Sequence, residues 1–241
     1  MIRLSVIIPC YNEQMRLVEG LSHHLSYLEK QKYLWELILV NDGSTDKTQQ
    51  LLANQRKNKN VKLISYPTNK GKGFAIVQGI KKAKGKYILF CDIDHSVPIS
   101  TIESFFQFFQ KNYSVVIGSR RVKGASFVKK QNLLRESLGR GFTLLVRTLI
   151  DWKISDATCG FKAFENSIAK KVFAKVSIYD WAFDAEILFI LKKYNIQVAQ
   201  CPVAWTDVKG SKVSLLKDVI RSFLGIVKIR INEISGKYDG I

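Results

Sequence analysis

Short apolar runs alternate with amphipathic stretches along the first half of the chain. The apolar runs predict buried strands at residues 4–8, 36–40, 61–65, 86–91 and 115–117. The stretches between them predict helices over about 12–30, 46–56, 73–83 and 98–111. Strands that alternate with helices indicate βαβ units, so we expect an α/β fold with a mostly parallel central sheet flanked by helices.

The second half of the chain has a less regular pattern. It predicts a helix over about 135–150, a tight loop at 155–162, a helix that begins near 181–188, a strand over 196–203 and a loop at 205–212. We therefore expect the main domain to extend over residues 1–212 and to be followed by a separate segment, 213–241.

That last segment has apolar residues at helical spacing, which predicts a C-terminal amphipathic helix to about residue 232. Its apolar face comprises Leu216, Val219, Ile220, Phe223, Ile226 and Val227, opposite Lys217, Asp218, Arg221, Gly225 and Lys228. Such a helix either packs on the protein core or lies on a membrane surface.

Polar residues stand where the first four predicted strands end. Asp92 and Asp94 follow the 86–91 strand, and the other three ends have the segments 9–13, 41–44 and 69–73. The carboxyl ends of parallel strands form the ligand crevice of open α/β sheets, so we expect these segments to line one site. Residues i and i+2 of an extended segment point to the same side, so Asp92 and Asp94 can converge on one hard cation.

Charge narrows the classes of partner. The chain has 38 Lys and Arg against 20 Asp and Glu, a net charge of +18, which favours nucleic acid, anionic lipid or phosphorylated substrates. Hydrophobic residues make up 46% of the chain, as in a folded globular protein rather than a disordered one. A protein that binds nucleic acid or an anionic membrane through charge alone is therefore one alternative to an enzyme.

The cysteines and the lengths of the apolar runs indicate where in the cell the protein is found. Cys10, Cys91, Cys159 and Cys201 form no C-x-x-C pair, and we expect buried free thiols in a reducing compartment. The N-terminal apolar run is too short for a signal peptide, and no apolar stretch reaches the about 18 residues of a transmembrane helix. We expect a cytoplasmic protein, peripheral at the cytosolic face of a membrane.

The four strand-end motifs together resemble those of family 2 glycosyltransferases, which have the GT-A fold, a nucleotide-sugar-binding α/β domain. The motifs are SVIIPCYNE at 5–13, VNDGS at 40–44, NKGKG at 69–73 and DID at 92–94. The resemblance implies that a nucleotide sugar contacts Pro9, Tyr11, Glu13, Asp42, Lys72 and Asp92, with Asp42 at the uracil or ribose. It also implies that Asp92 and Asp94 hold a divalent cation, Mg²⁺ or Mn²⁺.

Motifs of the second half narrow this resemblance. IGSR at 117–120, DATCGFK at 156–162, WAFDAE at 181–186 and GSK at 210–212 closely resemble motifs of dolichyl-phosphate β-glucosyltransferases and, less closely, of polyprenyl-phosphate mannose synthases. Two features depart from the mannose synthase pattern: Ser96 stands two positions after Asp94, and no Arg stands at 207–209, before the GSK loop.

The resemblance implies inverting, metal-dependent transfer of glucose from UDP-glucose to a dolichyl or other polyprenyl phosphate, with no nucleic acid partner. Two alternatives stay open: mannosyl transfer from GDP-mannose to polyprenyl phosphate, and a family 2 transferase that acts on a hydroxyl acceptor.

A phosphate acceptor also assigns roles to the remaining residues. Its second pKa is about 6, so near neutral pH the dianion is a ready nucleophile and needs no catalytic base. It needs cations, and we expect Arg120, Arg135 and Lys212 to hold it while Asp94 serves the leaving diphosphate. Asp184 and Glu186 are candidates for a base or an acceptor contact if the acceptor is a hydroxyl. Otherwise they are carboxylates at a helix N-terminus.

Overall fold

The computed structural model of the chain describes the backbone of residues 1–129, 133–150, 153–180, 182–208 and 215–240. Within these ranges, it does not describe the side chains at 128–129, 133–139, 142 and 215–223. The strands are β1 (Leu4–Cys10), β2 (Trp35–Asp42), β3 (Val61–Tyr66), β4 (Tyr87–Phe90), β5 (Val115–Ser119), β6 (Ser126–Lys129), β7 (Lys162–Glu165), β8 (Val198–Pro202) and β9 (Ala204–Thr206). The helices are α1 (Leu17–Leu28), α2 (Thr48–Ala53), α3 (Lys72–Lys82), α4 (Ile102–Gln110), α5 (Leu133–Leu149), α6 (Asn166–Lys175), α7 (Phe183–Lys193) and α8 (Leu215–Ile234), with short 3-10 helices at Asn54–Lys57 and Ile99–Thr101.

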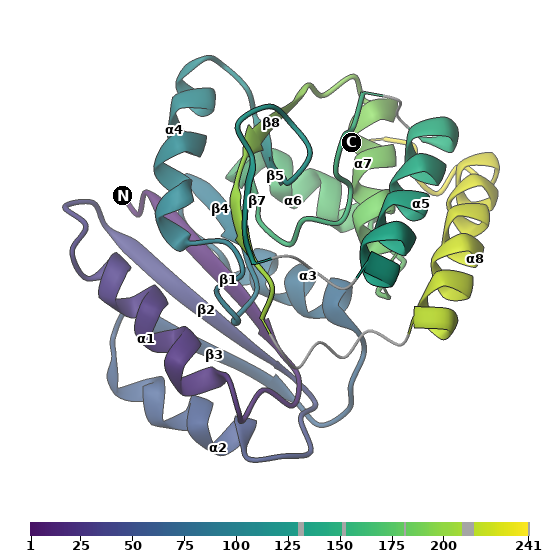
Figure 1. Cartoon of the computed structure of the whole chain (residues 1–241). Coiled ribbons are helices and arrows are strands. Elements are labelled where there is room, and N and C mark those ends of the chain that lie inside the picture. Colours follow the sequence, from purple (N-terminus) through teal and green to yellow (C-terminus); the bar gives the residue numbers. More distant parts are fainter. Residues whose placement is uncertain (130–132, 151–152, 181, 209–214, 241) are drawn as a thin grey trace.

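A seven-stranded central sheet has the strand order β3-β2-β1-β4-β7-β5-β8, and β6 pairs with β9 in a small second sheet (Figure 1). The pairs of the central sheet are parallel except those of β7, which runs antiparallel to both β4 and β5. Strands β2 and β4 are buried along their whole length. Burial on both faces explains why they read as continuous apolar runs rather than alternating ones.

Helices cover both faces of the sheet. On one face, Val6 and Ile8 of β1 pack in a cluster with Leu21 of α1 and with residues of α2 and α4. Between them in the sequence, Ile7 points to the other face and packs with Ile76 of α3 and with residues of α6 and α7. Helices α5 and α8 lie outside α7 on this second face (Figure 1). The predicted α/β architecture with a mostly parallel sheet is confirmed.

The second half of the chain contains short strands that the sequence pattern does not predict. The predicted tight loop at 155–162 leads directly into β7, which begins at its last residue, and α6 follows β7. The segment after β5 includes β6, which pairs with β9 at the start of the predicted loop 205–212. These strands are only three or four residues long, and β7 begins with Lys162 and ends with Glu165, so no apolar run marks it.

The C-terminal helix is present as α8, but its faces differ from the prediction. Ile226 and Ile229 lie in the core cluster, and Gly225 is buried against Ala182, although the sequence pattern placed Gly225 on the polar face. Val227, predicted on the apolar face, is 43% exposed. The helix meets the core through Gly225, whose missing Cβ lets the backbone approach Ala182 closely. The predicted face residues before 224 lie outside the described side chains.

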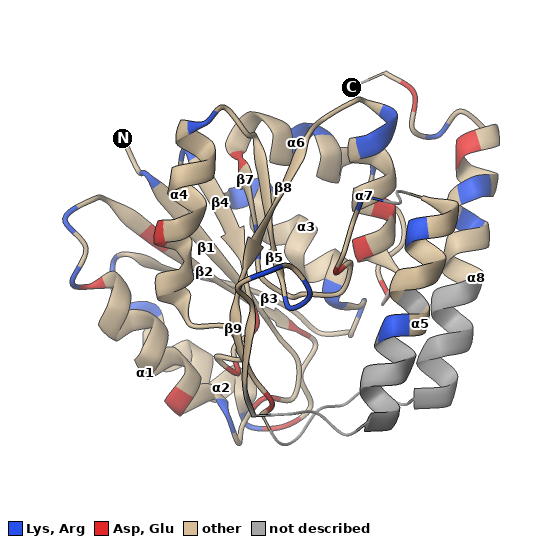
Figure 2. Cartoon of the chain, turned by 45° about the horizontal axis from the view of Figure 1, so that its top comes forward, with Lys and Arg blue, Asp and Glu red and all other residues tan. Residues whose placement is uncertain are grey.

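Three further observations concern the whole chain. All four cysteines are free and buried, as predicted. Among the helices described, none is long and apolar enough to cross a membrane. Lys and Arg are distributed over most helices and connecting loops rather than gathered on one element (Figure 2).

Candidate active site

The carboxyl ends of β1, β2, β3 and β4 lie at one edge of the sheet because these strands run parallel to one another. The strand-end segments therefore share this edge, where open α/β sheets bind their ligands. Hydrogen bonds join neighbouring segments. Asn12 meets Ser44 and Thr45, and the Asn69 amide donates to the Asp42 carboxylate.

Asp92 lies two residues beyond β4 and forms an ion pair with Lys72, the first residue of α3. The Lys72 Nζ lies 2.6 Å from the Asp92 Oδ1. Burial alone would lower the pKa of Lys72, but the Asp92 and Asp184 carboxylates raise it above its ordinary value. Gly160 lies on the other side of Asp92, and a Cβ at this glycine would come 2.1 Å from Oδ2. Asp92 thus lies between a cation and a glycine, and its side chain is 39% exposed.

Asp94 is held by Ser96 and faces an arginine. Its Oδ1 accepts hydrogen bonds from the Ser96 backbone N–H at 3.0 Å and hydroxyl at 2.5 Å. Its Oδ2 lies 3.5 Å from Nη1 of Arg16, which also donates from Nε and Nη2 to the Glu13 carboxylate at 2.9 Å each. Arg16 had no predicted role. The available signal was its place three residues after Glu13, in the segment that follows a strand end.

The Asp92 and Asp94 carboxylates fit a hard divalent cation that also binds a substrate. Carboxylate oxygens are ligands that Mg²⁺ and Mn²⁺ prefer. In the described part of the chain, no three His, Cys, Asp or Glu side chains gather as a metal site. Two carboxylates completed by substrate phosphate oxygens are a common arrangement for Mg²⁺. Lys72 and Arg16 place two positive charges beside the same carboxylates, which suits a diphosphate.

Asp42, predicted at the uracil or ribose, holds the loop that precedes Lys72. Its Oδ1 accepts a hydrogen bond from the Lys70 N–H at 2.8 Å, and its Oδ2 accepts from the Asn69 amide at 2.9 Å and the Gly71 N–H at 3.0 Å. Gly71 has φ of +98°, a conformation that favours glycine. The Asp42 side chain therefore fixes the turn from which Lys72 reaches Asp92.

The other predicted nucleotide contacts follow the end of β1. Pro9 lies within β1 opposite Val40 of β2, and Tyr11 is 37% exposed just beyond the strand. The backbone N–H of Glu13 donates to the Thr48 hydroxyl at 2.7 Å, which ties this segment to α2. Pro9, Tyr11 and Glu13 thus lie at the same edge as Asp42 and the carboxylates.

Arg120 follows β5, and its guanidinium is held by a loop residue, Asp156. Nε lies 2.7 Å from Oδ2 and Nη2 lies 2.8 Å from Oδ1, and Nη2 also donates to the Thr158 hydroxyl at 2.8 Å. Burial alone would raise the pKa of Asp156, but hydrogen bonds from Arg120 lower it to about 2. The guanidinium carbon also lies 5.6 Å from the centre of the Trp205 ring. Nε and Nη2 of the Arg120 guanidinium thus donate within the protein. Arg120 therefore has fewer N–H donors left for an acceptor phosphate than an exposed arginine has.

The structure does not describe the side chains of the two other residues predicted to bind the acceptor phosphate. Arg135 lies in α5, where its side chain is not described, and Lys212 lies outside the described residues. Their contact with an acceptor phosphate stays a prediction.

Asp184, in the first turn of α7, lies close to the donor residues. It forms a buried ion pair with Lys162. Burial raises the pKa of Asp184, while the Lys162 and Lys72 cations oppose this effect and the Asp92 carboxylate adds to it. Phe183, the residue before Asp184, lies against Gly73, the residue after Lys72, so the structure brings the first turn of α7 close to Lys72.

Glu186, two residues further along the same helix turn, has a different environment. It is fully buried and accepts hydrogen bonds from the Ser177 N–H at 2.9 Å, the Ser177 hydroxyl at 2.7 Å and the Tyr238 hydroxyl at 2.7 Å. These contacts anchor the C-terminal tail and the segment before α7. The structure does not bring Glu186 to the carboxylates at the strand ends.

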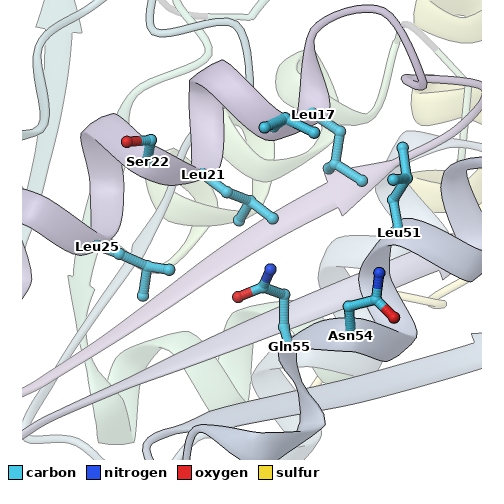
Figure 3. A pocket seen from close by; sticks show the side chains of 8 residues that line it. Leu17, Leu21, Ser22, Leu25, Leu51, Asn54 and Gln55 are labelled. Atoms are coloured by element: carbon cyan, nitrogen blue, oxygen red, sulfur yellow. The ribbon is translucent and has the colours of Figure 1, made fainter.

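A separate hollow of about 340 Å³ lies between α1 and α2 (Figure 3). Its lining is mostly apolar and comprises Leu17, Val18, Leu21, Ser22, Leu25, Leu51, Asn54 and Gln55. None of the predicted site residues lines it, so the strand-end edge remains the candidate site.

Comparisons with known proteins point to one family. The family model described as "Glycosyl transferase family 2" matches residues 5–173. A dolichyl-phosphate beta-glucosyltransferase of Dictyostelium discoideum is 36% identical over 248 residues, which cover 98% of this chain and 76% of the relative. The enzyme of that description from Homo sapiens is 31% identical over 250 residues, covering 98% and 77%.

Solved structures show the same fold at low sequence identity. Mannosyl-3-phosphoglycerate synthase of Rubrobacter xylanophilus superposes with a TM-score of 0.70 at 15% identity, covering all of this chain and 77% of that one. Glucosyl-3-phosphoglycerate synthase of Mycobacterium tuberculosis, solved with Mn²⁺, UDP and glucosyl-3-phosphoglycerate, gives 0.66 at 16% identity, covering 94% and 79%. The family match over most of the chain, together with this GT-A-type fold, shows that the chain belongs to glycosyl transferase family 2 and is a glycosyltransferase.

Proposed function

We propose that this glycosyltransferase moves glucose from UDP-glucose to dolichyl phosphate or another polyprenyl phosphate, with inversion at the sugar carbon. The product would be a β-glucosyl phosphate lipid. The observation that carries the proposal is the likeness along nearly the whole chain to dolichyl-phosphate beta-glucosyltransferases, at 36%, 35% and 31% identity for the Dictyostelium, yeast and human enzymes. The matched region includes both the strand ends and the loops around Arg120 and Asp184.

The donor half of the site is suited to a nucleoside diphosphate. Lys72 and Arg16 place their cations beside Asp92 and Asp94, where negative charge would develop on the leaving group. Asp42 fixes the loop that orients Lys72, so this cation needs little reorganisation when the donor binds. A bound Mg²⁺ or Mn²⁺ would act as a Lewis acid toward the diphosphate oxygens.

The acceptor half needs cations more than it needs a base. A phosphate dianion attacks the sugar carbon with its own oxygen, the bond from that carbon to the diphosphate breaks, and UDP leaves with the electron pair. Attack from the face opposite the leaving group accounts for inversion. Arg120, held rigidly by Asp156, together with Arg135 and Lys212, would hold the two anionic reactants near each other.

One observation favours a second candidate, transfer to a hydroxyl acceptor. Asp184 lies near Asp92, and burial raises its pKa, as is common for general bases. Its Oδ1, however, is bonded to the Lys162 ammonium, which favours the ionised carboxylate in a structural ion pair. The effect of Asp184→Asn separates the two candidates.

A transfer assay tests the proposal directly. Wild type is incubated with UDP-glucose and a short polyprenyl phosphate, with Mn²⁺ or with a chelator, and GDP-mannose serves as the competing donor. We expect a glucosyl phosphate lipid that forms only with the cation. Asp94→Asn should lower kcat/KM about 100-fold, since charge stabilisation at such sites amounts to several kcal/mol.

Asp184→Asn also breaks the buried ion pair with Lys162, so it should lower activity no further than Lys162→Met does. Two results would contradict the proposal: no metal-dependent lipid product from UDP-glucose, or a folded Asp184→Asn protein that is inactive while Lys162→Met retains activity. The second result would instead support a base mechanism.

We also propose that α8 meets an anionic membrane beside the lipid acceptor. Leu224, Val227, Ile231 and Ile234 are 59%, 43%, 60% and 86% exposed. Their spacing places them on one face of α8, away from the core. Exposed Lys228 and Arg230 lie among them, a pattern that fits a helix on an anionic bilayer surface. Co-sedimentation with anionic vesicles measures this contact.

A further inference from the structure

Lys162, the first residue of β7, has a fully buried ammonium group. Its side chain is 0% exposed. Nζ donates hydrogen bonds to the carbonyl oxygens of Ala157 at 3.1 Å and Cys159 at 2.8 Å, and to the Asp184 carboxylate. A lysine ammonium has three N–H donors, so these acceptors use all of them.

Stability alone gives a weak reason for this arrangement. Removing two charges from water is expensive, and replacing a buried ion pair by apolar residues of similar volume is often neutral or stabilising. The surroundings of Lys162 would accept such residues, since its Nζ lies 5.7 Å from the centre of the Phe90 ring, within the apolar core. We therefore look for the role of this ion pair in the segments that it connects.

Lys162 holds a loop that touches both halves of the site. Asp156 at the start of this 156–160 loop binds Arg120 on the acceptor side. Gly160 at its end lies against Asp92 on the donor side, where even a methyl group would collide. The two carbonyls bonded to Lys162 lie between these contacts in the loop.

We propose that Lys162 is a positioning residue of the transfer reaction. It fastens the 156–160 loop to Asp184 and so sets the separation between Asp92, at the donor diphosphate, and Arg120, at the acceptor phosphate. The identity of the two substrates rests on the proposed function, whereas the contact of the loop with Asp92 does not. Misplacement of reacting groups by about 1 Å costs about 100-fold in rate.

The test compares Lys162→Met with a matched variant at the opposite edge of the sheet. Glu36 is 2% exposed and accepts hydrogen bonds from Ser5, Lys62 and Lys84, each at 2.6 Å, so Glu36→Gln also disturbs a buried carboxylate network. Melting temperature, the affinity for UDP and GDP by calorimetry with Mn²⁺, and kcat and KM are measured for both.

Both variants should melt at lower temperature than wild type. Only Lys162→Met should also bind UDP about tenfold more weakly, as expected when a supporting residue of a ligand site is lost. Its kcat should fall about 100-fold at saturating substrate. Lys162→Arg, which keeps the charge, should retain part of the UDP affinity and part of the kcat that Lys162→Met loses. Equal changes in UDP affinity for Lys162→Met and Glu36→Gln would overturn the proposal and leave Lys162 a structural residue.

If Lys162→Met does not fold, Lys162→Arg and Gly160→Ala decide the matter. Gly160→Ala presses a methyl group against Asp92 and should weaken UDP binding with Lys162 in place. Unchanged affinity in both variants would overturn the proposal. Failure of the wild type to transfer glucose while it still binds UDP would reject the proposed function alone, and a wild type that binds neither nucleotide would reject both.

Discussion

Four carboxylates around the candidate site lie beside a cation. The pairs are Lys72 with Asp92, Arg16 with Asp94, Arg120 with Asp156 and Lys162 with Asp184, and Arg16 also binds Glu13. These cations offset the negative charge of the acids, so the site can hold several carboxylates without repelling a diphosphate. A buried acid that loses its cation is left uncompensated, so the cost of breaking a pair should depend on how deeply the acid is buried.

Arg120 provides a residue-scale prediction. Asp156 is 0% exposed, so Arg120→Gln leaves a buried charge without its bidentate partner. We expect the free energy of unfolding to fall by about 3 kcal/mol, which lowers the melting temperature by about 6–12 °C. Thermal and urea denaturation measure both quantities.

The control is Arg230→Gln, which breaks an exposed pair with Glu233. Exposed pairs contribute about 0–1 kcal/mol, so this variant should melt close to wild type. Equal small losses in the two variants would show that the Asp156 pair does not stabilise the fold.

The sequence predicts the acids of the site better than their partners. Asp92 and Asp94 stand out because they end an apolar strand, a local signal. Arg16 meets Asp94 across 78 positions of the chain, and nothing near either residue in the sequence indicates the pairing. Lys162 looked like a charged loop residue, because its burial depends on the packing of β7 between two other strands.

At the scale of elements, local periodicity predicts strands β1 to β5 and misses β6, β7 and β9. Strands β2 and β4 are apolar runs because they are buried along their whole length. Strand β7 is held by its neighbours on both sides and needs little propensity of its own. It is also the antiparallel strand, which alternation of strands and helices does not predict.

Close approach of α1 to the site gives an element-scale prediction. A Cβ on Gly20 would lie 2.0 Å from the carbonyl oxygen of Ile93, between Asp92 and Asp94. Gly20→Ala should therefore push α1 away and lower the free energy of unfolding by about 1–3 kcal/mol. It should also weaken UDP binding, because Arg16 at the start of this helix faces Asp94. Denaturation and calorimetry measure the two effects.

Gly141 in α5 is the matched control. A Cβ there would have no neighbour within 4 Å, so Gly141→Ala should raise the free energy of unfolding by up to about 1 kcal/mol through helix propensity alone. If Gly20→Ala were stabilising as well, the close contact between α1 and the 91–94 segment would be wrong.

At the scale of the whole molecule, the candidate site lies at the carboxyl ends of the strands, and the exposed apolar row lies on α8 and comprises Leu224, Val227, Ile231 and Ile234. The core clusters cover both sheet faces, and the Tyr238 hydroxyl in the C-terminal tail donates to Glu186 of α7. Helix α8 is therefore fastened to α7, the helix that supplies Asp184. A membrane contact through α8 would orient the strand-end edge relative to the lipid.

Vesicle binding tests that orientation. Wild type should co-sediment with vesicles that contain anionic lipid more than with neutral ones, and less at high salt, because basic residues accompany the apolar row. Ile231→Glu should weaken the partition about tenfold or more, since burying one aliphatic side chain contributes about 1.5–3 kcal/mol. Val18→Glu is the control, because Val18 is 65% exposed on α1, across the sheet from α8. With a short, water-dispersed acceptor, both variants should keep wild-type turnover. If Val18→Glu reduced vesicle binding as much as Ile231→Glu does, α8 would be ruled out as the membrane-facing helix.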